Sequence, residues 1–280
     1  MKDLVLTAIN AALEAGDAIG QVYRRDFTVA SKQDQSPLTQ ADCDSHEIIL
    51  RHLSPTGIPV LSEEGRDIPY GERAGWVQLW IVDPLDGTKE FIKRNGEFTV
   101  NIALVAAGSP LLGVVLAPEM DRLYFGAREL GAWRASTADV GCLFQGGGDF
   151  SKGHLWEGLM GVSRKLPLPD LKPEIYTIVG SRSHATPELA AFIAAKRAEY
   201  PRVEFISAGS SLKICLVAEG AADIYPRLGP TMEWDTAAGQ GVVEAAGGRL
   251  IDADSRQPLR YNRQDLLNPW FYVLGVEGEL

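Results

Sequence analysis

Residues 80–88 read WIVDPLDGT, and this stretch sets the first expectations for both the fold and the site. Its apolar first half predicts a buried strand, which Pro84 should end because proline cannot donate to a strand ladder. Gly87 suits a tight turn. Asp83 and Asp86 offer the oxygen ligands that hard cations bind, and the amides that follow would face an anion held by those cations. The spacing alone fits a turn with a helix N-cap equally well.

Acidic residues recur at three other places where an element is predicted to begin or end. The motif SEEG places Glu63 and Glu64 directly after a predicted strand. EWDTAAG places Asp235 at the start of a helix, and LTQAD places Asp42 in the first turn of another. Each has an ordinary structural interpretation, a solvated turn for SEEG and helix capping for the two aspartates. Taken singly, these motifs do not identify a metal site.

The first half of the chain predicts two helices followed by several strands. Apolar residues recur every three or four positions up to about residue 25, and a second helix is expected over 41–53, before Pro55. A polar loop is expected between these helices, over 31–40. Apolar runs bounded by turns predict strands at 58–61, 77–82, 98–106, 111–117 and 123–125. This order indicates an α+β domain with a largely antiparallel sheet.

Residues 136–172 interrupt the pattern, because three glycines at 146–148 are followed by several prolines. We interpret this segment as a loop or linker and place the domain boundary near it, giving domains 1–140 and 141–280. Beyond it strands and helices alternate, which predicts an α/β domain. The expected strands are 175–179, 203–207, 223–225, 249–251 and 271–274, and the expected helices are 187–199, 210–219 and 233–246.

The composition limits the partners and the location. With 27 Lys and Arg against 37 Asp and Glu, the net charge is −10, which disfavours nucleic acid; an anionic substrate would need screening metal ions. Three distant cysteines without a CxxC pair favour a reducing, cytoplasmic setting and inert, packed thiols. The N-terminus has no signal-peptide pattern. The uncharged run 98–118 approaches a bilayer span, but Asn101 and a Gly-Ser-Pro turn favour two strands over a transmembrane segment.

Taken together, the motifs resemble the magnesium-dependent inositol monophosphatase superfamily, and within it the 3′(2′),5′-bisphosphate nucleotidase branch of the bacterial CysQ type. DPLDGT and the WD pair are typical of the superfamily, whereas KEFIKRNGEFTVN, GSSLK and YPRLGPT favour the branch. The resemblance covers nearly the whole chain and is poorest at about 135–172. It implies an α+β domain packed on an α/β domain, in a layered α/β/α/β/α sandwich with the active site between them.

The resemblance also implies a set of metal ligands for two or three Mg²⁺ ions. Asp83 would bridge two of the ions. Two Mg²⁺ ions would cancel the charge of the carboxylates and still polarise a phosphate. The first domain would supply most of these ligands and the second domain the last one. The implied ligands are the side chains of Glu63, Asp83, Asp86 and Asp235 and the backbone carbonyl of Leu85.

By the same resemblance, Thr88 and Asp42 orient the water that attacks phosphorus, and Glu64 supports them. Helix capping remains the alternative for Asp42. The amides of Gly87 and Thr88 would cradle the phosphate that is cleaved, because a helix N-terminus offers unpaired N–H groups.

A bisphosphate substrate carries a second phosphate, which needs donors of its own. We expect Ser210, Ser211, Lys213 and Arg227 to contact it, with His184 of the motif GSRSH as the next candidate. A solvated helix charge is the alternative for Lys213, and a surface position is the alternative for His184. No residue is identified as the wall for an adenine ring. The predicted substrate contacts also include Glu63, Leu85, Asp86, Gly87, Thr88 and Asp235.

The implied function is a Mg²⁺-dependent phosphomonoesterase that converts 3′-phosphoadenosine 5′-phosphate into AMP and phosphate. A metal-activated water would be the nucleophile, and the reaction would belong to sulfur metabolism. An inositol monophosphatase or another sugar phosphatase, such as a fructose bisphosphatase, is the nearest alternative. A non-catalytic metal or nucleotide sensor is the alternative from another class. The oligomeric state and any peripheral membrane association are left open.

Overall fold

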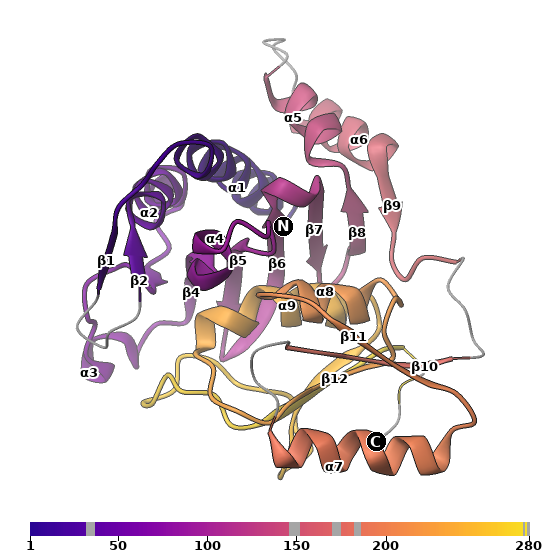
Figure 1. Cartoon of the computed structure of the whole chain (residues 1–280). Helices are drawn as coiled ribbons and strands as arrows, with labels where there is room; N and C mark the ends of the chain where they lie inside the picture. Colours follow the sequence, from indigo (N-terminus) through magenta and orange to yellow (C-terminus); the bar gives the residue numbers. More distant parts are fainter. Residues whose placement is uncertain (32–36, 146–151, 170–174, 182–185, 277, 279–280) are drawn as a thin grey trace.

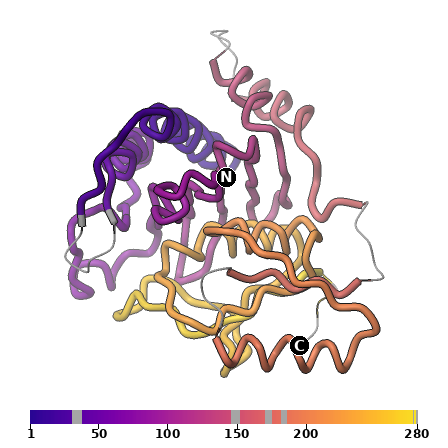
Figure 2. The backbone as a smooth tube through the Cα atoms, viewed as in Figure 1, coloured from indigo at the N-terminus to yellow at the C-terminus, as the bar shows by residue number. Residues whose placement is uncertain are grey.

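The computed structural model describes residues 1–31, 37–145, 152–169, 175–181, 186–276 and 278. Five layers alternate through the molecule: helices, a seven-stranded sheet, helices, a five-stranded sheet and one further helix (Figure 1). The layered α/β/α/β/α sandwich is therefore confirmed. The larger sheet comes from β3–β9 and the smaller one from β10–β14, and the colours of the tube in Figure 2 show that these two parts of the chain occupy separate regions.

Two long helices form the first layer, as the sequence predicts. α1 (Lys2–Tyr23) and α2 (Gln40–Leu53) pack on one face of the large sheet, where Ile9, Ile19 and Ile49 are fully buried. Between these helices lies a hairpin of β1 (Val29–Ser31) and β2 (Pro37–Thr39), so the expected polar loop is wrong at these two strands. Residues 32–36 lie outside the described residues.

The seven-stranded sheet follows chain order, and every neighbouring pair is antiparallel except β3–β4. The largely antiparallel sheet is thus confirmed, and the run 98–118 forms two paired strands. Side chains alternate between faces along β4: Trp80 and Val82 face α1 and α2, whereas Leu79 and Ile81 face the second half. The strands are β3 (Val60–Ser62), β4 (Gln78–Asp86), β5 (Thr99–Ala106), β6 (Ser109–Ala117), β7 (Arg122–Ala127), β8 (Gly131–Ala135) and β9 (Ser163–Lys165).

The expectation that Pro84 ends its strand is wrong. β4 continues to Asp86, with a register shift between the pairs Asp83–Asn101 and Asp86–Thr99. Such a bulge leaves residues of one strand without a ladder partner, so the missing N–H of proline is tolerated there. The Pro84 carbonyl instead accepts a hydrogen bond from the Ser45 hydroxyl at 2.7 Å.

The interpretation of residues 136–172 as a loop is also wrong over most of their length. α5 (Thr137–Gln145) and α6 (Lys152–Val162) are helices. Trp156 and Leu159 pack into the hydrophobic core between the large sheet and α1 and α2. The glycines and prolines of this segment indicated a loop, but the burial of Trp156 and Leu159 stabilises helices instead. The glycines at 146–148 lie outside the described residues. Because β9 pairs with β8, the large sheet extends to Lys165; the boundary at 140–141 stays a prediction.

The second half alternates strands and helices, as predicted. Its five strands lie in the order β11–β10–β12–β14–β13. α7 (Pro187–Glu199) covers the outer face, where Phe192 and Ile193 pack on Ile178 and Ile224. α8 (Leu212–Ala218) and α9 (Glu233–Ala245) lie between the two sheets (Figure 1). The strands are β10 (Tyr176–Gly180), β11 (Val203–Ser207), β12 (Ile224–Arg227), β13 (Arg249–Asp252) and β14 (Phe271–Leu274).

Glycines allow α9 to approach the large sheet closely. A Cβ on Gly113 of β6 would lie 1.9 Å from the carbonyl oxygen of Ala238, and a Cβ on Gly241 would lie 2.7 Å from the Gly113 nitrogen. Side chains at these positions would push the helix away from the sheet. This contact therefore determines how near the N-terminus of α9 lies to the end of β4.

Four short helical segments connect the larger elements. They are α3 (Tyr70–Arg73), α4 (Thr88–Ile92), and the 3-10 turns η1 (Ser54–Thr56) and η2 (Pro118–Met120).

The cysteines form no disulfide. Cys215 is buried, but Cys142 is exposed, so the prediction of a packed thiol is wrong for Cys142. Among the described residues, no helix combines the length and apolar character needed to cross a membrane.

Candidate active site

Asp83, Asp86 and Asp235 meet between the two halves of the molecule. Each offers a carboxylate oxygen, and the three oxygens lie within 4.8 Å of one another. Asp83 and Asp86 belong to the bulged end of β4, whereas Asp235 belongs to the first turn of α9. Backbone amides orient two of them: Leu85 donates to Asp83 Oδ1 at 3.1 Å, and Met232 donates to Asp235 Oδ2 at 2.8 Å.

The electrostatics of this cluster fit a hard divalent cation. Burial and the neighbouring carboxylates of Glu63, Asp86 and Asp235 raise the pKa of Asp83 well above its usual range. Burial and the charge of Asp86 raise the pKa of Asp235 to about 8. Buried like charges at this spacing disfavour ionisation unless a cation compensates them. An all-oxygen donor set is the kind that Mg²⁺ or Ca²⁺ prefers.

The other predicted ligands lie around the same cluster. Glu63 follows β3, its N–H donates to the Val82 carbonyl at 3.1 Å, and its carboxylate acts on Asp83 through both charge and a hydrogen bond. The Leu85 carbonyl lies 3.5 Å from the Thr88 hydroxyl, on the same turn. Glu64 lies next to Glu63 in the SEEG turn and is half-buried. The ligand roles themselves remain predictions.

Asp42 caps α2 and also contacts Thr88, and its role in orienting a water stays a prediction. Its Oδ2 accepts hydrogen bonds from the Thr39 amide at 2.7 Å and the Thr39 hydroxyl at 2.6 Å, which caps α2. Its Oδ1 accepts from the Thr88 hydroxyl at 3.3 Å. Capping therefore holds the carboxylate in place while one oxygen faces Thr88.

The loop between β4 and α4 is held from the second half of the molecule. Gly87 has a φ of +93°, a left-handed conformation that favours glycine, and a Cβ there would lie 2.1 Å from Ser210 Oγ. The Ser210 hydroxyl lies 2.8 Å from the carbonyl oxygens of both Asp86 and Glu97. Ser210 thus supports the loop; its predicted contact with substrate stays a prediction.

Ser211 and Asn101 connect the aspartates of the two halves. The Ser211 hydroxyl lies 3.0 Å from Asp86 Oδ2 and 2.6 Å from the Asp235 carbonyl oxygen. Asn101 Nδ2 donates to Ser211 Oγ at 2.9 Å and to Asp86 Oδ2 at 3.4 Å. Asn101 was not predicted as a site residue, although a buried amide side chain in an apolar strand was the available signal. These bonds orient Asp86 toward Asp235.

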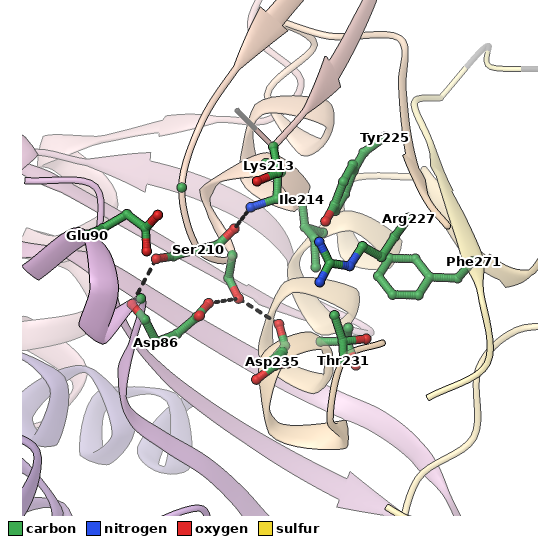
Figure 3. A pocket seen from close by; sticks show the side chains of 15 residues that line it. Asp86, Glu90, Ser210, Lys213, Ile214, Tyr225, Arg227, Thr231, Asp235 and Phe271 are labelled. Atoms are coloured by element: carbon green, nitrogen blue, oxygen red, sulfur yellow. Dashed lines mark hydrogen bonds between the residues drawn. The ribbon is translucent and has the colours of Figure 1, made fainter. Parts of the chain in front are cut away.

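A pocket opens beside the aspartates, and Figure 3 shows the side chains that point into it. It places Asp86 and Asp235 at one end and two basic side chains, Lys213 and Arg227, beyond them. The pocket is lined by Asp86, Gly87, Glu90, Ser181, Gly209, Ser210, Ser211, Lys213, Ile214, Tyr225, Arg227, Thr231, Asp235, Thr236 and Phe271.

Lys213 and Arg227 form the cationic side of this pocket. Lys213 is 6% exposed, so the alternative of a solvated helix charge is wrong. Its ammonium donates to the Ser210 carbonyl at 2.6 Å and lies 5.5 Å from the centre of the Tyr225 ring, and burial lowers its pKa to about 8. Arg227 donates to the Pro230 carbonyl at 2.7 Å, while its buried Nε finds no hydrogen-bond partner within the described ranges.

The structure also identifies pocket residues that the sequence analysis did not name. Ile214, Tyr225 and Phe271 give an apolar and aromatic side, and the Tyr225 and Phe271 rings meet edge to face at 5.8 Å. Tyr225 begins the motif YPRLGPT, and this motif was the signal in the sequence that could have identified Tyr225 as a pocket residue. Glu90 likewise belongs to a quoted motif, KEFIKRNGEFTVN. The candidate His184 lies outside the described residues, as do Arg182 and Ser183.

Comparisons with known proteins agree with this geometry. The sequence model of the inositol monophosphatase family matches residues 1–272. The chain is 46% identical over 269 residues to the 3′(2′),5′-bisphosphate nucleotidase CysQ of Escherichia coli K12, covering 94% of this chain and 96% of the relative. It is 33% identical to the CysQ of Haemophilus influenzae, covering 95% of this chain and 91% of that one.

Solved structures give the same result. The crystal structure of CysQ from Bacteroides thetaiotaomicron superposes with a TM-score of 0.88 at 47% identity, covering 99% of this chain and 98% of that one. The Thermotoga maritima IMPase has a TM-score of 0.70 at 19% identity, covering 98% and 92%, and shares the fold. On the family match, the curated relatives and the shared layers, this chain belongs to the inositol monophosphatase family.

Proposed function

We propose that this chain is a Mg²⁺-dependent 3′(2′),5′-bisphosphate nucleotidase that removes the 3′-phosphate of 3′-phosphoadenosine 5′-phosphate. The observation that carries the proposal is one pocket with an acidic cluster at one end and the basic pair Lys213 and Arg227 beyond it. The 46% identity to nucleotidases of that name supports the substrate class. A cytoplasmic role in sulfur metabolism belongs to the same proposal.

The metal site in this proposal uses the predicted ligand set. The side chains of Glu63, Asp83, Asp86 and Asp235 and the carbonyl of Leu85 would hold two or three Mg²⁺ ions. When bound, the ions would supply Lewis acidity toward the phosphate and neutralise the buried carboxylates. The hydrogen bonds from Asn101 and Ser211 orient Asp86 for this role.

The residues of the chain would position the nucleophile and the phosphate. Because the Thr88 hydroxyl donates to Asp42, its lone pairs stay available to accept a hydrogen bond from a water molecule. That water forms the new bond to phosphorus as the bond to the 3′-oxygen breaks, so the products are AMP and phosphate. The amides of Gly87 and Thr88 would donate to the phosphate oxygens, since they start α4.

A substrate panel tests the proposed activity. Phosphate release would be measured with Mg²⁺ on adenosine 3′,5′-bisphosphate, inositol 1-phosphate and fructose 1,6-bisphosphate. We expect the highest kcat/KM on the adenosine bisphosphate, because only this substrate offers a nucleotide phosphate to the basic pair. A preference for inositol 1-phosphate would indicate the monophosphatase alternative, and no release from any substrate would indicate a non-catalytic sensor.

Arg227→Ala tests the role of the basic pair. A phosphate bound to Arg227 gains charge-assisted hydrogen bonds of roughly 1.5–3 kcal/mol each. We therefore expect kcat/KM on the adenosine bisphosphate to fall about ten- to a hundredfold, while slow hydrolysis of inositol 1-phosphate is nearly unchanged. Arg249→Ala, at an exposed position of β13 in the same sheet, is the matched control. Equal losses on both substrates would show that Arg227 supports the fold instead.

A further inference from the structure

Glu90 places a carboxylate in a pocket whose other features suit an anion. It belongs to α4 and lines the same cavity as Lys213 and Arg227; in Figure 3 it lies across the pocket from Arg227. Its Oε2 lies 3.5 Å from the position that a Cβ on Gly87 would occupy. The carboxylate therefore lies beside the loop that is proposed to hold the phosphate being cleaved.

This carboxylate is not used by the protein itself. Within the part of the chain that the structure describes, the Glu90 side chain accepts no hydrogen bond and forms no ion pair. Lys213 is close enough for the charge of Glu90 to act on its pKa, but its ammonium is bound by the carbonyls of Ser210 and Ala208 at 2.6 and 3.3 Å. Neither of these bonds involves Glu90, so its carboxylate stays available to a group that fills the pocket.

The chemistry of a carboxylate limits what it can meet there. An ionised carboxylate accepts hydrogen bonds and cannot donate them, so it attracts a hydroxyl or an amine and repels a phosphate. If the phosphate that is cleaved lies against Gly87, next to Glu90, the substrate donor closest to that phosphate is the hydroxyl on the adjacent carbon of the sugar.

We infer that Glu90 determines specificity by accepting a hydrogen bond from the hydroxyl vicinal to the phosphoester, and that its charge excludes a second anionic group from that position. This inference rests on the proposed nucleotidase function and adds a substrate contact to it. It assigns opposite sides of one pocket to different substrate groups: Arg227 to the distant phosphate and Glu90 to the sugar hydroxyl.

A substrate-by-variant cycle tests the inference. The wild type and Glu90→Ala would be assayed with Mg²⁺ on adenosine 3′,5′-bisphosphate and on its 2′-deoxy analogue. We expect the wild type to prefer the ribose form by about ten- to a hundredfold in kcat/KM, the range of a hydrogen bond to a charged group. Glu90→Ala should lower kcat/KM only on the ribose substrate, so that the ribose-to-deoxyribose ratio of kcat/KM comes close to one. Glu90→Gln, which keeps an acceptor oxygen, should give an intermediate ratio.

The controls separate this contact from a structural role. Lys89→Ala changes the exposed neighbour on α4 and should leave the ribose-to-deoxyribose ratio unchanged. Equal losses on both substrates in Glu90→Ala, or a wild type that shows no preference, would overturn the inference while leaving the nucleotidase function in place. Failure of the wild type to hydrolyse either compound would overturn the proposed function and the inference together.

Discussion

At the scale of single residues, the site depends on carboxylates that the metal-free fold holds at a cost. Asp83 is 1% exposed and faces three other carboxylates, which together with burial raise its pKa. The nearby cations offset this charge only in part: Lys213 donates to the Ser210 carbonyl and Arg227 to the Pro230 carbonyl, while the charge of Arg227 lowers the pKa of Asp235. The cluster therefore lowers the stability of the fold in the absence of a cation, and it is suited to bind one.

Asp83→Asn should lower activity and raise stability, and so separate the role of this carboxylate in metal binding from its cost to the fold. Loss of the proposed bridging charge should lower turnover by several orders of magnitude, even at saturating Mg²⁺. Removal of one crowded charge should raise the Tm of the metal-free protein, because it relieves repulsion among buried groups. Steady-state assays and thermal melts in EDTA would measure both. Asp67→Asn, at an exposed position in the loop after Glu63, is the control; near-normal turnover in Asp83→Asn would falsify the metal assignment.

Thr88→Ala tests the proposed orientation of the water. A group that positions the nucleophile acts mainly in the transition state, so kcat should fall by roughly a hundred- to ten-thousandfold. The affinity for Mg²⁺, measured by calorimetry, should be nearly unchanged, and Thr88→Ser should restore much of the rate. A rise in KM alone would mean that Thr88 binds substrate and does not orient the water.

At the scale of elements, the close contact between α9 and β6, called the seam below, positions Asp235, the last of the predicted acidic ligands. The backbones of Gly113, Gly241 and Ala238 meet there without intervening side chains. α9 begins at Glu233, so any displacement of the helix moves Asp235 relative to the end of β4. The geometry of the proposed metal site therefore depends on this seam.

Gly113→Ala should destabilise the protein and lower its activity together. Inserting a methyl group against the Ala238 carbonyl is an overpacking change, which costs about 1–3 kcal/mol or more. We expect a lower midpoint of urea unfolding and weaker Mg²⁺ binding in the folded protein. Gly141→Ala, in α5 with open space around its Cβ position, should be neutral or stabilising. A Gly113→Ala protein with wild-type stability would show that α9 adjusts without cost.

At the scale of the whole molecule, the active site joins two sheets. Glu63 follows β3, and Asp83 and Asp86 belong to β4 of the large sheet, whereas Asp235 lies on α9, between the two sheets. Ser210 and Ser211, from the second half, bind the backbone and side chain of Asp86 in the first. Metal binding should therefore stabilise the contact between the halves as well as the site.

The stability of the metal-free protein should depend on pH in a defined direction. The pKa of Asp235 is raised to about 8 in the folded state, so its contribution favours folding at low pH and is lost as the pH rises from about 4 through 8. We expect the Tm in EDTA to fall between about pH 6 and about pH 8.5, and to fall less in Asp235→Asn. Mg²⁺ at about 100 times its Kd should stabilise by about 2.7 kcal/mol. If the Tm fell equally steeply with pH in the wild type and in Asp235→Asn, the raised pKa of Asp235 would be contradicted.

The sequence by itself determined most of the elements and the acidic motifs, because those signals are local. α7 begins where Thr186 accepts a hydrogen bond from the Leu189 amide and Pro187 occupies the first turn, and its predicted bounds match the structure at both ends. The strand pattern and the motifs around Asp83 and Asp235 are likewise contained in short windows. The prediction of a loop over residues 136–172 is wrong because its glycines and prolines are local signals, which the burial of Trp156 and Leu159 outweighs.

Only the tertiary structure decided how those motifs work together. The Ser210 hydroxyl meets the Asp86 carbonyl across 124 positions of sequence, and Asn101 meets Ser211 across 110. The burial of Lys213 and the position of the Glu90 carboxylate in the pocket depend on where α4 and α8 lie relative to each other. Hydrogen bonding, desolvation and charge repulsion act over a few ångströms in space, so a sequence window that ends at the neighbouring element cannot contain them.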